Sequence, residues 1–209
     1  MARSVPLRAI LDACRDALNE AEDAYSEWSG GITVRAAPES LVQTYIAQEL
    51  AKLKPAPKLL LEASVVAITR KAEDLEHEDA DANGEQLGGR LDLALYYAVK
   101  KTGAMPRVLI EVKKLTKNDS IAIDLERIRK LMTRLPGIQR GVLVGYTTRV
   151  NEATIDGLIK AQIAGDTNAT LPVRVARKIK IRPAKSRKRK VVQLGGAVYV
   201  VRRNTKPEE

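Results

Sequence analysis

Two apolar stretches of the chain each carry charge in their middle: residues 90–99 read RLDLALYYAV and residues 107–113 read RVLIEVK. In the first stretch leucines alternate with Asp92, a period of two that predicts a β-strand with Asp92 on the face opposite the leucines. In the second, Glu111 and Lys113 are two residues apart and therefore share a face. The intervening segment contains glycine and proline and predicts a turn. We therefore expect a hairpin that brings Asp92 close to Glu111 and Lys113.

Charges inside apolar strands cost free energy unless they are paired or hold a metal ion. Two carboxylates with no histidine or cysteine beside them suit Mg²⁺, which keeps several waters and binds one or two carboxylates together with substrate phosphate. Lys113 beside such an ion would orient a water and offset charge that develops on phosphorus. The alternative interpretation is a structural cross-strand ion pair. The spacing of Asp92, Glu111 and Lys113 is by itself weak evidence for a metal site. Their position on two apolar strands strengthens that interpretation.

Apolar periodicity and turn residues predict the remaining organisation. The expected helices are 6–28, 38–53, 119–135 and 151–164, and the expected strands are 58–69, 90–99, 107–113, 141–146, 173–181 and 191–202. The acidic stretch 73–85 is expected to be a solvated loop. This order predicts an α/β fold with a mixed central sheet flanked by helices, followed by a basic, β-rich C-terminal extension. The corresponding segments are 1–35 (helical), 36–170 (core) and 171–209 (extension).

The positive charge of the chain lies in its last sixth. The sequence has 36 Lys and Arg against 26 Asp and Glu, a net charge of +10. Residues 1–173 hold 23 basic and 24 acidic side chains, whereas residues 174–209 hold 13 and 2. Such a basic block repels itself unless a polyanion lies against it, so nucleic acid is the expected partner. A solvated basic tail or a patch for acidic lipid is the alternative.

The side chains expected to contact nucleic acid are all basic. They are Lys114, Arg174, Arg177, Lys178, Lys180, Arg182, Lys185, Arg187, Lys188, Arg189 and Lys190.

Composition excludes several other classes of protein. No run of 18 apolar residues exists, so we expect no membrane-spanning helix. The N-terminal residues lack the apolar core of a signal peptide. Cys14 is the single cysteine, which excludes an internal disulfide, and it falls on an apolar helical stripe that predicts a core position. The stretch 141–145 lacks the spacing of a phosphate-binding loop, so no nucleotide cofactor is expected. We therefore expect a cytoplasmic protein with no membrane partner.

The residues around the two charged strands resemble a known family. GRLDL at 89–93 and LIEVKK at 109–114 are similar to the signature of the PD-(D/E)XK nuclease superfamily, which includes restriction endonucleases, repair nucleases and Holliday-junction resolvases. The common core of that superfamily runs helix, three strands, helix, strand, as does the order expected here from Glu39 to Tyr146. The resemblance covers about half of the chain and implies a restriction-endonuclease-like αβββαβ core.

The resemblance also implies roles for individual residues. Asp92 and Glu111 would be metal ligands, with the backbone carbonyl of Val112 as a third donor, and Lys113 would be the catalytic lysine. The implied ion is Mg²⁺, with Mn²⁺ as the alternative. A glutamate on the helix before the first strand often joins the site in this family. Glu39 matches that position best.

Other features near the motif are weaker. Glu49 is the runner-up to Glu39. Leu91 stands where the nominal pattern has proline, and no Gln-x-x-x-Tyr follows on the next helix, which disfavours the exonuclease branch. Asp124 and Arg127 on that helix are interpreted as solvated charges, with contact to the DNA backbone through their exposed face as the alternative.

The sequence thus predicts a Mg²⁺-dependent DNA endonuclease whose basic C-terminal arm grips the DNA backbone. A catalytically silent DNA-binding protein on a nuclease fold is the alternative. A structural protein whose tail binds RNA or a membrane surface ranks last, because it leaves the charged strands unexplained. A double-strand cut needs two active sites, so a homodimer fits this interpretation, with the first helix as its candidate interface. The type of DNA substrate stays open.

Overall fold

The computed structural model describes residues 5–69, 89–96, 106–115, 121–147, 176–179 and 194–201. The helices in these ranges include α1 (Leu7–Trp28), α2 (Glu39–Ala51) and α4 (Ile121–Arg134), with a 3₁₀ turn η1 (Val34–Ala36). The strands are β1 (Lys58–Ser64), β2 (Arg90–Tyr96), β3 (Pro106–Lys114), β4 (Arg140–Thr147), β5 (Ala176–Ile179) and β6 (Leu194–Val201). The helix expected at 151–164 and the acidic stretch 73–85 lie outside the described residues.

The strands of the described ranges form one six-stranded sheet in the order β1-β2-β3-β4-β6-β5. β3 and β4 are parallel, and the other neighbouring pairs are antiparallel. The predicted α/β class and mixed sheet are therefore confirmed. β5 and β6, which come from the segment expected as an extension, continue the same sheet through the pairing of β6 with β4. The division into three segments stays a prediction.

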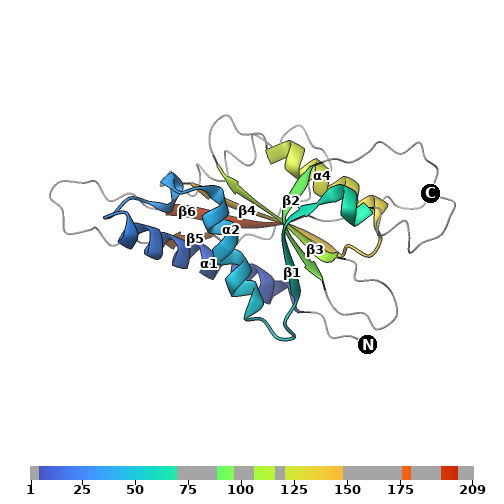
Figure 1. Ribbon diagram of the computed structural model, residues 1–209, viewed down its shortest axis with the longest axis horizontal. Coiled ribbons are helices and arrows are strands. Elements are labelled where there is room, and N and C mark those ends of the chain that lie inside the picture. Colours follow the sequence, from blue (N-terminus) through green and yellow to red (C-terminus); the bar gives the residue numbers. More distant parts are fainter. Residues whose placement is uncertain are drawn as a thin grey trace.

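Apolar side chains cover both faces of the sheet. On one face Leu93, Ile110 and Val144 pack into a core with residues of α1 and α2. On the other face Leu109 and Leu143 pack into a second core with α4. Figure 1 shows α1 and α2 lying next to each other, apart from α4. Because successive strand residues alternate between faces, each central strand contributes to both cores.

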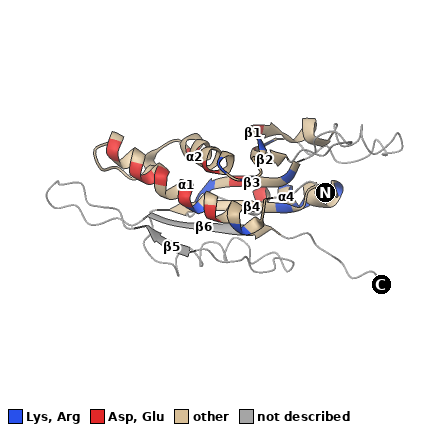
Figure 2. Cartoon of the chain, turned by 90° about the horizontal axis from the view of Figure 1, so that it is seen from below, with Lys and Arg blue, Asp and Glu red and all other residues tan. Residues whose placement is uncertain are grey.

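Helix α1 confirms the amphipathic helix expected over 6–28. Its apolar stripe is buried, and Cys14 is fully buried as predicted. Most of its acidic residues lie outside this stripe, and Figure 2 shows acidic residues recurring along the helix. None of the helices in the described ranges has an apolar stretch of the length that a bilayer requires.

The strand expected over 58–69 is wrong in its second half. β1 ends at Ser64 and residues 65–69 are helical. The hydroxyl oxygen of Ser64 accepts a hydrogen bond at 3.3 Å from the backbone N–H of Ala67, as an N-capping residue does. Val65 and Ile68 are buried in the α4 core. Tertiary packing thus overrides the strand preference of the β-branched residues here.

Helix α4 approaches β4 very closely at Gly141. A Cβ atom on Gly141 would lie 2.3 Å from Cγ2 of Ile128 on α4, a distance that real Cβ atoms do not show. The absence of a side chain at this position therefore lets α4 settle onto the sheet. This close packing fixes the polar face of α4 beside the end of β3.

Candidate functional site

The β2–β3 hairpin expected from the sequence is confirmed. Leu93 pairs with Ile110 and Ala94 with Leu109, so continuation of the same antiparallel register sets Asp92 opposite Glu111. The carboxylate oxygen Oδ2 of Asp92 accepts a hydrogen bond at 2.6 Å from the backbone N–H of Val112. The carboxyl groups of Asp92 and Glu111 lie close enough to perturb each other's pKa.

Glu111 is buried and Asp92 is half-buried, and burial raises the pKa of both carboxyl groups. Glu111 is only 4% exposed. Burial, and then the charge of Asp92, raise the pKa of Glu111 to about 8 despite the opposing charge of Arg127. Burial also raises the pKa of Asp92, while the N–H of Val112 opposes the rise. Of the two carboxyl groups, Glu111 is the more deeply buried. A cation at this position would let both groups ionise.

Glu39 joins the pair from α2. It lies in the first turn of that helix, where the helix dipole favours an anion. Burial, and then the charge of Asp92, raise its pKa, whereas Lys113 and a hydrogen bond from the backbone N–H of Lys114 lower it. Glu49, the runner-up, instead pairs with Lys52. Of the two glutamates, the structure brings Glu39 alone to Asp92.

Lys113 lies in a network with α4 that the sequence interpretation missed. Its ammonium nitrogen Nζ is 3.2 Å from Oδ2 of Asp124. The other carboxylate oxygen of Asp124 is 3.0 Å from Nη2 of Arg127, and the same Nη2 contacts Glu111. The interpretation of Asp124 and Arg127 as solvated charges is therefore wrong: Asp124 is 9% exposed and Arg127 is half-buried. Their spacing of three residues sets both on the side of α4 that faces β3.

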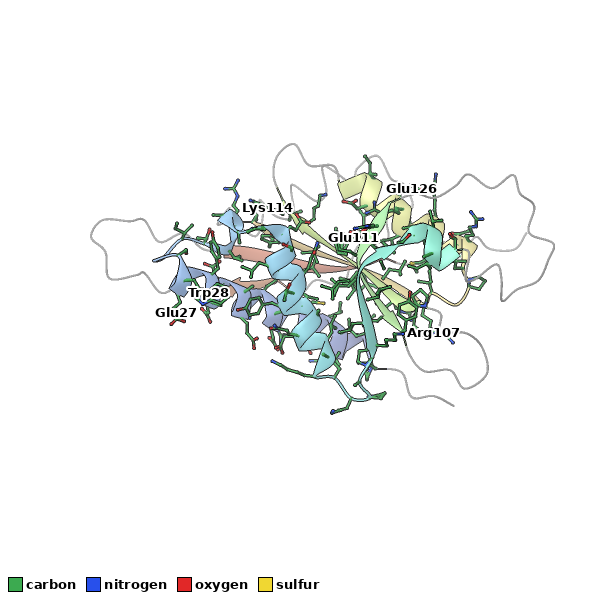
Figure 3. The ribbon with its side chains drawn as sticks, viewed as in Figure 1. Glu27, Trp28, Arg107, Glu111, Lys114 and Glu126 are labelled. Atoms are coloured by element: carbon green, nitrogen blue, oxygen red, sulfur yellow. The ribbon has the colours of Figure 1, made fainter. Side chains whose placement is uncertain are left out.

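Figure 3 shows Glu111 near the centre of the sheet, and Glu126 on the outside of α4. The two glutamates differ in burial, because Glu126 is exposed whereas Glu111 is covered by α4. Glu126 is therefore a matched control for Glu111 in the experiments below.

Two further residues of the site were not singled out from the sequence. The hydroxyl of Tyr146 on β4 is buried and has no hydrogen-bond partner among the described residues. Burial raises the pKa of Tyr146, and the charges of Glu39 and Asp92 add to the rise. The charge of Glu62 on β1 also raises the pKa of Asp92. The backbone of Glu62 has a φ of 50°, in the left-handed region. Two features of the sequence could have indicated these residues. Tyr146 ends the strand expected at 141–146, and Glu62 is a charged residue directly after three leucines.

The predicted nucleic-acid residues are only partly covered by the structure. Lys114 is half-buried at the end of β3. Arg177 and Lys178 belong to β5. The other eight predicted residues, between 174 and 190, lie outside the described residues.

The donor chemistry of the site suits a hard divalent ion, since it offers carboxylates and backbone carbonyls without histidine or cysteine. In the described ranges, no group of three or more acidic, histidine or cysteine side chains is arranged to hold a metal ion. Arg127 instead contacts Glu111, and Lys113 contacts Asp124. The residues therefore fit Mg²⁺ by donor chemistry, while Arg127 holds one of the expected ligands, Glu111.

Comparisons of the chain with protein-family models, with curated proteins and with solved structures gave no match.

Proposed function

We propose that this protein is a divalent-metal-dependent nuclease that hydrolyses DNA phosphodiester bonds. The observation that carries the proposal is the meeting of Glu39, Asp92, Glu111 and Lys113 from three different elements at one place on the sheet. The carboxylates offer oxygen atoms of the kind that bind a divalent ion, and the lysine beside them offers positive charge for metal-assisted hydrolysis of phosphate esters. Burial of these carboxyl groups does not by itself stabilise the fold, because paired carboxyl groups in an apolar core cost free energy.

Each residue has a defined role in this proposal. Asp92 and Glu111, with the backbone carbonyl of Val112, would hold Mg²⁺ or Mn²⁺, and Glu39 would complete the ligand set. The bound ion would polarise a phosphoryl oxygen and lower the pKa of a coordinated water. Lys113 would offset the negative charge that develops on the phosphate, because its ammonium group is held 3.2 Å from Asp124 beside these ligands.

The charge distribution supports an approach of DNA from the end of β3. The acidic outer face of α1 would repel a phosphate backbone. Lys113 and Lys114 lie at the end of β3, next to the carboxyl groups. The basic residues between 174 and 190 would add phosphate contacts that do not read sequence.

The test is cleavage of supercoiled plasmid and of duplex, single-stranded and four-way-junction DNA. Each substrate is incubated with the protein in Mg²⁺, Mn²⁺ or EDTA. Glu111→Gln and Lys113→Met are expected to abolish cleavage. Glu126→Gln on the outside of α4 and Lys58→Met at the exposed start of β1 remove the same charges away from the site, and we expect them to cut as the wild type does.

Metal-dependent cleavage that disappears in Glu111→Gln and Lys113→Met alone would support the proposal. The DNA that is cut fastest would define the branch of nuclease. Cleavage that survives in Glu111→Gln, or that proceeds in EDTA, would contradict it.

A catalytically silent DNA-binding protein is the second candidate, and one observation favours it. Arg127 contacts Glu111, so a cation already neutralises one of the proposed metal ligands. A silent protein would bind the same DNAs in a salt-sensitive manner, would leave them intact in every metal, and would bind equally well after Glu111→Gln.

A further inference from the structure

Arg127 occupies a distinctive position between two carboxylates. Its nitrogen Nη2 contacts Oε1 of Glu111 and lies 3.0 Å from Oδ1 of Asp124. On the other side of the guanidinium, Nη1 would be 3.3 Å from a Cβ atom on Gly89, just before β2. The third nitrogen, Nε, is buried and has no hydrogen-bond partner among the described residues. The guanidinium thus fits closely between α4 and the β2–β3 hairpin.

We propose that Arg127 is the resident cation of the site, which a divalent ion must displace from Glu111, and that the displaced guanidinium then binds the phosphate to be cleaved. This inference rests on the proposed nuclease function and names the residue that couples metal binding to substrate binding.

Competition between Arg127 and a metal follows from the shared acceptor. An ion held by Glu111 would share this carboxylate with Arg127, which contacts its oxygen Oε1. A neighbouring guanidinium changes the affinity of a carboxylate for a proton by roughly ten- to a thousandfold, and it opposes a divalent ion in the same sense. Removal of Arg127 should therefore strengthen metal binding, although it removes a residue from the site.

Asp124 explains why Arg127 would remain at the site after displacement. One oxygen of Asp124 binds Arg127 and the other lies 3.2 Å from Lys113, so this carboxylate holds both cations beside the metal ligands. A guanidinium that leaves Glu111 keeps its contact with Asp124 and gains free N–H groups. A phosphate diester supplies the acceptors, in the bidentate geometry that arginine favours.

The first experiment measures Mn²⁺ binding by titration calorimetry in the absence of DNA. We expect Arg127→Met to bind Mn²⁺ about tenfold more tightly than the wild type. Arg129→Met is the matched control, because Arg129 lies on the same helix and pairs with Glu126 at 3.9 Å. That control loses the same charge, and we expect its affinity to stay within about twofold of the wild type.

The second experiment measures plasmid cleavage at saturating Mn²⁺. Arg127→Met should cut roughly a hundredfold more slowly, the usual effect of losing one charge-stabilising donor. Arg127→Lys, which keeps the charge without the fork of donors, should fall between Arg127→Met and the wild type in both measurements. It also remains informative if Arg127→Met fails to fold.

The outcomes separate the two proposals. Tighter Mn²⁺ binding together with slower cleavage in Arg127→Met supports the role of Arg127, because a merely structural residue would weaken both. Mn²⁺ binding in Arg127→Met that is no tighter than in Arg129→Met overturns it, while the nuclease proposal survives. A wild-type protein that binds no Mn²⁺ overturns the nuclease proposal itself.

Discussion

Replacement of Glu111 by glutamine should remove most of the pH dependence of stability between about pH 5 and pH 8. The pKa of Glu111 rises from 4.5 to about 8 on folding, mainly through burial and the charge of Asp92. The folded state therefore retains a proton that the unfolded chain releases above pH 4.5. Stability from this group is fully present below pH 4.5 and is lost as the pH rises through 8.

The magnitude follows from the two pKa values. One retained proton changes the free energy of unfolding by about 1.4 kcal/mol per pH unit. Over the interval from 4.5 to about 8, the loss amounts to about 5 kcal/mol, a large share of the stability of an ordinary domain. Because Glu111 is only 4% exposed, solvent screening reduces this value little. Glutamine keeps the shape of the protonated acid and does not titrate.

The assay is urea unfolding from pH 5 to pH 8.5 in buffer with EDTA. The free energy of unfolding of the wild type should fall more steeply with pH than that of Glu111→Gln, by about one proton. The variant should be the more stable protein at pH 8. Glu126→Gln, an exposed change on α4, should follow the wild type. Parallel curves for the wild type and Glu111→Gln would refute the assignment of the retained proton to the buried carboxyl pair.

Three other changes test the packing, the site and the basic arm. Gly141→Ala should lower the free energy of unfolding by about 1–3 kcal/mol in urea, because its Cβ would lie 2.3 Å from Ile128, and an unchanged midpoint would contradict that close packing. Tyr146→Phe should raise the free energy of unfolding in metal-free buffer by about 1 kcal/mol, since it removes a buried hydroxyl without a partner among the described residues, and a loss of stability would show that the hydroxyl is satisfied. In a salt titration of DNA binding, six phosphate contacts from 174–190 would give a slope of log K against log salt near −5, and a flat dependence would remove the arm from the interface.

The fold class and the strand pair of the site were readable from local patterns. The alternation of leucine with Asp92, and the two-residue spacing of Glu111 and Lys113, depend only on the strand period. The period holds for Leu93 and Leu95, which pack in the core with α1 and α2, but Leu91 packs in the core with α4, so the expected common face of the three leucines is wrong at Leu91. The same reasoning failed at residues 65–69, because burial of Val65 and Ile68 against α4 favoured a helical turn over the strand preference of the side chains.

The remainder of the site was decided by packing between elements far apart in the sequence. The sequence around Asp124 and Arg127 fits a solvated helix and a buried helix equally well. The close packing of α4 at Gly141 is what brings Arg127 into contact with Glu111. The raised pKa of Glu111 likewise depends on the sum of burial and neighbouring charges, which no local pattern contains. By itself, the sequence determined which side chains share a strand face, because that periodicity is local. The tertiary structure alone decided which charges from α2 and α4, and which hydroxyl from β4, surround them, because those contacts arise only when the elements pack together.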